Sequence, residues 1–376
     1  MTPCYCYCTV TVCTHTIPIV CWEKELDSTK TMSEKKRQRT GDVSLIGYHG
    51  AEASFTCVAA RRYFEKYAST YGAEFEASGS LKDIFDRLKN GSLTYGVIPV
   101  ESSSNGTLNG SYDFILRSSS EISIVGETIE KEVHCLCAIS AIDESAIYKV
   151  MSHPVLVQDC SHFLDKLDEK RAKQGQPPID RMAVHDSAIA CRQLTAAPDS
   201  TGIAVICTQQ AAALYGLTVI CQAVGNDRNS ETRYAILSKS DPINLSQVGG
   251  MTGPGNTLKA SVAVTIKNAP GSMYRMIACF GLRDINIINI ERRPASTAVG
   301  FLNLSRSGEE IRHWDTIFFI DYEPSSDEAV NEALMNNLTE FSMWLRPLGR
   351  YRRCGQAHTV TVLSDWGNMV DILATA

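Results

Sequence analysis

The stretch Ser240–Thr257 constrains the fold of this chain more than any other feature of its sequence. It is rich in glycine and proline and carries almost no charge, a composition typical of a linker. At 376 residues the chain is also too long for one ordinary core. The sequence therefore predicts an N-terminal tail at 1–42, a larger domain at 43–240, a linker at 241–257, a smaller domain at 258–354 and a C-terminal tail at 355–376.

The larger domain alternates between apolar runs and segments with helical spacing. Strands are predicted at Val43–Gly47, Thr94–Val100, Ile203–Cys207, Thr218–Ala223 and Arg233–Leu237, and Ile122–Ile139 is predicted to be extended. Helices are predicted at Phe55–Tyr63, Leu81–Leu88, Tyr112–Leu116, Ser145–Met151, Val157–Lys170 and Gln209–Tyr215. Two such runs, joined by an extended segment and closed by a returning strand, predict an α/β domain with two lobes and a cleft between them.

The smaller domain is typical of a two-layer module. Strands are predicted at Val262–Ile266, Asn286–Glu291, Gly300–Leu304 and Ile317–Tyr322, with helices at Met273–Phe280 and Asp327–Leu338. We predict a βαββαβ order for this module, which is ferredoxin-like. Such modules often pair with a copy from another subunit, so we expect a homodimer or homotetramer.

Composition excludes several classes of protein. The formal net charge is −6, and no basic block exists beyond Lys35–Arg39, which argues against nucleic acid as the partner. No stretch is apolar for long enough to span a bilayer. The first 22 residues contain no Lys or Arg, so the positive region of a signal peptide is absent. We expect a cytoplasmic protein, with plastid targeting by residues 1–42 as the alternative.

Cysteine spacing does not indicate a metal site. The chain has 14 cysteines but no Cys-x-x-Cys pair, so buried free thiols are expected.

Three loops are candidates for ligand binding. Gly47–Gly50 follows a strand and opens a helix, so its amides either hold an anion or form a tight turn. Pro99–Gly106 leaves a buried strand as a hydroxyl-rich segment, which is either a ligand loop or a plain polar loop. Asn226–Tyr234 is a polar turn that leads into Thr232 and Arg233 at the start of the last strand of this domain, where Arg233 offers a planar fork to a carboxylate. A structural salt bridge is the alternative for Arg233.

Further stretches complete a family pattern. They are Gly50–Phe55, Ser152-His153-Pro154 with Gln158, and Asp186-Ser187-Ala188. In order and spacing, the region from Val43 to Leu237 resembles prephenate dehydratase, and the closely related arogenate dehydratase. The smaller domain resembles an ACT domain, because Ala269–Met273 is similar to its glycine loop and Ile290–Pro294 to its Glu-Ser-Arg-Pro element.

The resemblance implies a lyase that removes carbon dioxide and water from prephenate to give phenylpyruvate, or from arogenate to give phenylalanine. Aromatisation drives the reaction, so no cofactor is implied. Thr232 is the implied catalytic residue, donating a hydrogen bond to the leaving C–O bond, and Arg233 would hold a carboxylate. The implied substrate-binding residues are Ser102, Ser103, Gln158, Ser187 and Tyr234.

The same resemblance implies that phenylalanine regulates the enzyme through the ACT-like module. The implied effector-binding residues are Ala269, Pro270, Gly271, Ser272, Met273, Glu291, Arg292, Arg293 and Pro294. Three positions depart from the family pattern: Ser102 replaces Asn, Tyr234 replaces Phe and Arg292 replaces Ser.

His134, His153 and His185 are the histidines to consider as general acids. His153 precedes a proline and is predicted to cap a helix, whereas His185 lies beside Asp186 and could reach the cleft. Glu101 is predicted to organise its loop, because a free carboxylate would repel an anionic substrate. The alternative of another class is a catalytically silent amino-acid sensor, built like a solute-binding protein.

Overall fold

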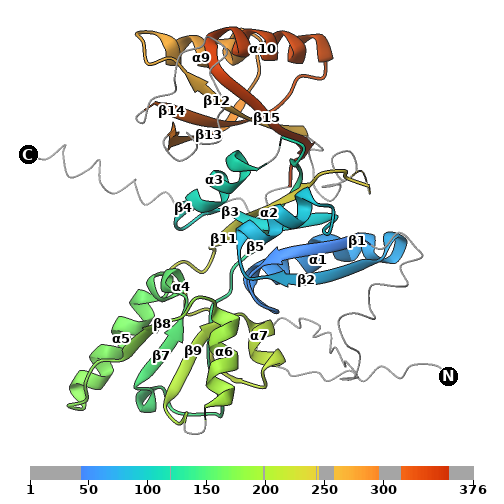
Figure 1. Ribbon diagram of the computed structural model, residues 1–376. Helices are drawn as coiled ribbons and strands as arrows, with labels where there is room; N and C mark the ends of the chain where they lie inside the picture. The colour runs from blue at the N-terminus through green and yellow to red at the C-terminus, as the bar shows by residue number, and fades with distance from the viewer. Residues whose placement is uncertain are drawn as a thin grey trace, which may run out of the picture. The chain divides into compact units, whose positions relative to one another are not determined.

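The computed structural model describes residues 44–354 except 119, 198–199, 243, 245–257 and 296–314. The predicted tails, most of the predicted linker and the predicted strand Gly300–Leu304 lie outside the described residues. Figure 1 labels the helices and strands discussed below.

The first lobe is a six-stranded mixed sheet with the strand order β2-β1-β3-β11-β5, and β4 pairs with β3. Its strands are β1 (Ser44–His49), β2 (Ala73–Ser78), β3 (Tyr95–Ser102), β4 (Gly106–Thr107), β5 (Ser123–Lys131) and β11 (Glu231–Ser238). β1 runs parallel to β2 and β3, whereas β11 is antiparallel to β3 and β5. Helix α1 (Phe55–Tyr71) packs on one face, and α2 (Leu81–Lys89) and α3 (Asn109–Arg117) pack on the other.

The second lobe is a five-stranded sheet in the order β10-β6-β9-β7-β8. Its strands are β6 (Cys135–Ala138), β7 (Lys149–Ser152), β8 (Asp180–Ala183), β9 (Ile203–Cys207) and β10 (Thr218–Cys221), and its helices are α4 (Pro154–Asp159), α5 (Ser161–Lys173), α6 (Ser187–Ala196) and α7 (Gln209–Leu214). The chain crosses between the lobes twice, from β5 to β6 and from β10 to β11. The predicted two-lobed α/β architecture is confirmed.

Two predicted helices of this lobe differ from the structure. Ser145–Met151 was expected to be helical, but only Glu144–Ala146 forms a 3₁₀ turn, and the rest leads into the inner strand β7. A short apolar run has the same composition in a buried strand as in a helix, which explains the error. The predicted helix Val157–Lys170 is in fact the pair α4 and α5, divided at Cys160.

The smaller domain is ferredoxin-like, as predicted. Its elements are β12 (Leu258–Ile266), α9 (Ser272–Gly281), β13 (Ile287–Pro294), β14 (Thr316–Tyr322), α10 (Glu328–Phe341) and β15 (Ser342–Arg352). They form an antiparallel sheet in the order β13-β14-β12-β15, and α9 and α10 cover one of its faces (Figure 1). The sequence did not predict β15, which starts directly after α10 without a turn signal.

The other face of this sheet packs against the first lobe. Ala263, Phe319 and Leu348 share one hydrophobic core with Val100 and Ala235. The rings of Tyr112 and Phe319 meet edge to face with their centroids 4.7 Å apart. Arg346 donates hydrogen bonds to the carbonyls of Ile115 and Ser118, each at 3.0 Å, and of Ile122 at 3.1 Å. The module therefore shares a core with the first lobe in addition to its covalent link.

Candidate active site

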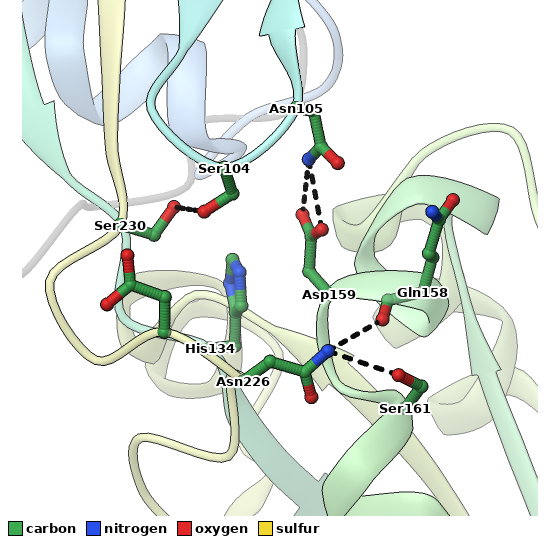
Figure 2. A pocket seen from close by; sticks show the side chains of 9 residues that line it. Ser104, Asn105, His134, Gln158, Asp159, Ser161, Asn226 and Ser230 are labelled. Carbon is green, nitrogen blue, oxygen red and sulfur yellow. Dashed lines mark hydrogen bonds between the residues drawn. The ribbon is translucent and has the colours of Figure 1, made fainter. Parts of the chain in front are cut away.

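A polar pocket of about 430 Å³ lies where the two crossings meet the loop after β3 (Figure 2). Its volume is within the range of small-molecule sites. It is lined by Ser104, Asn105, His134, Gln158, Asp159, Ser161, Asn226, Asp227 and Ser230.

The loop after β3 is held rigidly at the mouth of this pocket. The amide of Ser103 donates to the carbonyl of Glu231 at 2.8 Å, and the Ser103 hydroxyl accepts from the Glu231 amide at 2.9 Å. The Ser104 and Ser230 hydroxyls are hydrogen-bonded at 2.9 Å. Asn105 reaches the second lobe, where its Nδ2 donates to both carboxylate oxygens of Asp159 at 2.9 and 3.0 Å. The bonds between Asn105 and Asp159 tie the two lobes together across the pocket (Figure 2).

Asn226 fixes the floor of the pocket. Its Oδ1 accepts from the amide of His162 at 2.9 Å, and its Nδ2 donates to the carbonyl of Gln158 and to the hydroxyl of Ser161, each at 3.1 Å. The side chain of Asn226 therefore holds the junction of α4 and α5 against the segment that connects β10 to β11. This junction brings Gln158, a predicted substrate-binding residue, into the pocket.

His134 is the histidine that the structure brings to the pocket. It is 2% exposed, and neither ring nitrogen has a hydrogen-bond partner. The ring of Phe55 contacts it edge to face at 5.3 Å. Burial lowers the pKa of His134, and the nearby carboxylate of Asp159 opposes that shift only in part. The imidazole is therefore neutral at neutral pH.

Thr232 lies on β11, two residues after Ser230. It is 3% exposed, is paired in the sheet with Ser102 and Glu130, and is not among the nine lining residues. Burial raises the pKa of Glu132, although hydrogen bonds from Thr232 and Tyr234 lower it in part.

Arg233 faces the opposite side of β11, because side chains alternate along a strand. Its guanidinium donates to Glu101 at 2.8 and 3.0 Å and lies 3.3 Å from Asp321 and 3.5 Å from Glu127. Lys259 completes this cluster at 2.9 Å from Glu127 and 3.0 Å from Asp321. The guanidinium therefore belongs to a buried ion-pair cluster with the module, which fits the salt-bridge alternative for Arg233. The same contact joins Glu101 of β3 to β11.

A second contact between the lobes involves the predicted anion loop. Asp186 caps α6 and also accepts from the amide of Ala51 at 3.1 Å. At Gly50, where φ is +100°, a Cβ would lie 2.7 Å from the same carboxylate, so glycine is required there. The loop thus holds a carboxylate of the protein itself.

The other predicted substrate residues do not line the pocket. Ser187 is buried at the start of α6, Ser102 is buried beside Thr232, and the Tyr234 hydroxyl donates to Glu132 at 3.2 Å. His153 caps α4 as predicted, since its Nδ1 accepts from the amide of Val155 at 3.3 Å. His185 is exposed beside Asp186.

The predicted effector residues divide between a loop and a strand. Residues 269–271 form the exposed loop before α9, in which Gly271 has φ +77°, and Ser272 and Met273 begin the helix. Of the β13 residues, Glu291 and Pro294 are half-buried, and Arg293 pairs with Asp113 at 2.7 Å. Arg292 is exposed and donates to Thr316 at 3.4 Å.

Two negative findings apply to the described residues. No group of three or more His, Cys, Asp or Glu side chains in this part of the chain is arranged to hold a metal ion. None of its helices is both long and apolar enough to cross a membrane.

Comparison with known proteins gives consistent matches. The family model for prephenate dehydratase matches residues 46–242, more than half of the 376-residue chain. The chain is 27% identical over 306 residues to arogenate dehydratase/prephenate dehydratase 2, chloroplastic, of Arabidopsis thaliana, which covers 81% of this chain and 72% of that protein. It is 26% identical over 307 residues to the bifunctional chorismate mutase/prephenate dehydratase of Aquifex aeolicus, with 81% and 73% covered.

Among solved structures, prephenate dehydratase from Arthrobacter aurescens in complex with L-Phe aligns with a TM-score of 0.65 at 20% identity, covering 88% of this chain and 100% of that one. This likeness supports the fold, and the family match extends over both lobes. The chain therefore belongs to the prephenate dehydratase family of lyases, which includes relatives named for prephenate and for arogenate.

Proposed function

We propose that this chain removes carbon dioxide and water from prephenate or arogenate in the pocket between its lobes. The observation that carries the proposal is the pocket itself. It combines Gln158 and the loop after β3, both expected from the family pattern, with the start of the strand that bears Thr232. Its serine, asparagine and glutamine side chains supply hydrogen-bond donors for the carboxylates of the substrate.

In this proposal Thr232 polarises the bond to the departing hydroxyl. Its position beside Ser102, two residues from Ser230, supports access once substrate displaces the Ser104–Ser230 hydrogen bond. Ser102, Ser103 and Gln158 orient the substrate, and Ser187 and Tyr234 support the surrounding elements. Arg233 acts through its ion pairs with Glu101, which precedes Ser102 in the loop.

Charge favours arogenate as a second candidate substrate. Asp159 and Asp227 line the pocket, and no Lys or Arg is among its nine lining residues. Arogenate carries an ammonium where prephenate carries a keto oxygen, and a carboxylate is attracted to an ammonium. Asp159 is the better placed of the two because it is half-buried, whereas Asp227 is exposed.

The test is a steady-state assay of the purified chain with each substrate, reading phenylpyruvate by absorbance and phenylalanine by chromatography. The proposal expects turnover of at least one substrate without added cofactor. Absence of both products would refute it. If arogenate is the preferred substrate, Asp159→Asn should lower kcat/KM for arogenate more than for prephenate, whereas equal losses would leave prephenate as the first candidate.

The ferredoxin-like module is proposed to act as an ACT domain that binds phenylalanine as an allosteric effector. The L-Phe complex of the Arthrobacter relative supports this assignment. The effector would bind between the loop Ala269–Met273 and strand β13 in a homodimer or homotetramer. Calorimetric titration with phenylalanine tests binding, and light scattering tests the assembly. No heat change at millimolar phenylalanine would leave the module with a structural role only.

A cytoplasmic location is the first proposal for this chain. The alternative is a plastid, which relatives named chloroplastic support. A fluorescent protein carrying residues 1–42 distinguishes the two locations.

A further inference from the structure

The unpartnered imidazole of His134 requires an explanation. A buried polar group without a partner is unfavourable, and buried polar groups in folded proteins nearly always have partners. His134 has two free ring nitrogens and is 2% exposed. Figure 2 shows its ring between the Ser104–Ser230 pair and Asn226. A ligand in the pocket would supply the missing partner.

The proton balance of the proposed reaction suggests a role for the His134 imidazole. Prephenate enters as a dianion and leaves as a phenylpyruvate monoanion, carbon dioxide and water, so each turnover consumes one proton. Arogenate going to phenylalanine consumes one as well. Threonine cannot supply this proton at neutral pH, because its hydroxyl is a very weak acid. A titratable group beside the departing hydroxyl must supply it.

We infer, on the basis of the proposed function, that His134 is the proton donor to the departing hydroxyl. The bond between the ring and the leaving carboxylate breaks, and its electron pair completes the aromatic ring. The C–O bond then gives its pair to oxygen, which takes a proton from the His134 imidazolium and leaves as water. The neutral imidazole then regains a proton from solvent. No step needs an oxidant or a reductant. Thr232 polarises the same C–O bond.

The surroundings make the protonation of His134 depend on substrate. Asp159 at the end of α4 and Asp227 before β11 are the acidic groups that line the pocket with it, Glu132 precedes it on the crossing, and Phe55 of α1 presents an apolar ring. Burial holds the pKa of the free imidazole below its usual value. The carboxylates of bound substrate add negative charge and raise it. His134 is therefore neutral before binding and takes up a proton as substrate enters.

This behaviour has a kinetic signature. The protonated form is active, so the rate falls as pH rises through the pKa of His134. The pH profile of kcat/KM reports the free enzyme and that of kcat reports the complex. The descending limb of kcat should therefore lie at higher pH than the descending limb of kcat/KM.

The experiment compares wild type, His134→Gln and the control His162→Gln, which changes an exposed histidine of α5. His134→Gln should lower kcat by about 10²–10³-fold, within the usual range for an acid catalyst, with a much smaller change in KM and no descending limb. His162→Gln should match wild type. In His134→Ala, added imidazole should restore part of kcat.

A His134→Gln variant that keeps kcat within threefold, or keeps the wild-type pH limb, would overturn the inference while leaving the proposed function intact. A wild-type chain without turnover would overturn both. If circular dichroism shows that neither His134 variant folds, the pH profiles of the wild-type enzyme decide the matter. Descending limbs of kcat and kcat/KM at the same pH would overturn the role of His134.

Discussion

Removing Lys259 tests the buried cluster that joins the module to the catalytic strand. Its ammonium lies 2.9 Å from Glu127 and 3.0 Å from Asp321, and these three side chains are 4%, 3% and 8% exposed. At an effective dielectric constant of about 20, each contact is worth about 5.5 kcal/mol before desolvation. Lys259→Met leaves both carboxylates buried with Arg233 as their remaining cation. Breaking a buried pair in this way costs about 3–5 kcal/mol.

The cost also has an upper limit, because a carboxylate can take up a proton instead of staying charged. Protonating an aspartate of ordinary pKa, about 3.9, at pH 7 costs about 4 kcal/mol, and at pH 5 about 1.5 kcal/mol. We therefore expect Lys259→Met to lower the free energy of unfolding by about 3–4 kcal/mol at pH 7 and by less at pH 5. The sign follows because the folded variant binds a proton that the unfolded chain does not hold at pH 5.

Urea unfolding followed by circular dichroism measures this difference. The matched control is Lys239→Met, whose partner Glu121 lies at a similar 3.0 Å but with side chains 41% and 58% exposed, so a loss of about 0–1 kcal/mol is expected. Lys259→Met combined with Asp321→Asn should regain part of the stability. A Lys259→Met deficit no larger than that of the control would refute the reasoning.

Three further predictions follow from named residues. Arg233→Lys should lower the free energy of unfolding by about 1–3 kcal/mol in urea titrations, because the hydrogen bonds to Glu101 and Tyr112 are lost. KM should stay nearly unchanged. Unchanged stability with a large rise in KM would instead support a role for Arg233 in binding a substrate carboxylate. Burial lowers the pKa of His49, His134 and His153, so the unfolded chain binds protons first and stability should fall as pH drops below about 6.5; urea titrations showing constant stability from pH 7.5 to 5.5 would contradict this. Gly271→Val should abolish the response to phenylalanine in kinetic assays while leaving basal turnover intact. A Cβ at this position meets no atom within 4 Å, but a β-branched residue cannot adopt φ +77° without strain. A normal response to phenylalanine would remove Gly271 from the effector site.

The periodic segments of the sequence were enough to predict the architecture. β9 shows why, since Val205 and Cys207 pack on one side and Ala204 and Ile206 on the other, and a strand buried on both faces reads as a continuous apolar run. The same property misled the prediction at β7, where the apolar residues of Ser145–Met151 fit either element.

The site was predictable only in part, for a related reason. β11 is buried on both faces, with Thr232 at 3% and Ala235 at 3% exposure, so its sequence does not reveal which face meets the pocket. The ion partner Asp321 lies 88 residues from Arg233, which no local pattern connects. Asn105 and Asn226 were inside the polar loops noted from the sequence, but their roles depend on contacts with α4 and α5 of the second lobe.

Thr232→Val tests the central claim most directly, because valine keeps the shape of threonine and removes only its hydroxyl. The matched control is Thr128→Val, a buried threonine on the neighbouring strand β5 opposite Tyr234. With the preferred substrate, the account predicts that Thr232→Val lowers kcat by about 10²–10³-fold, the usual cost of one hydrogen-bond donor to the reacting group, while Thr128→Val stays within a few-fold of wild type. A Thr232→Val enzyme that folds and keeps a third or more of the wild-type kcat would contradict the account.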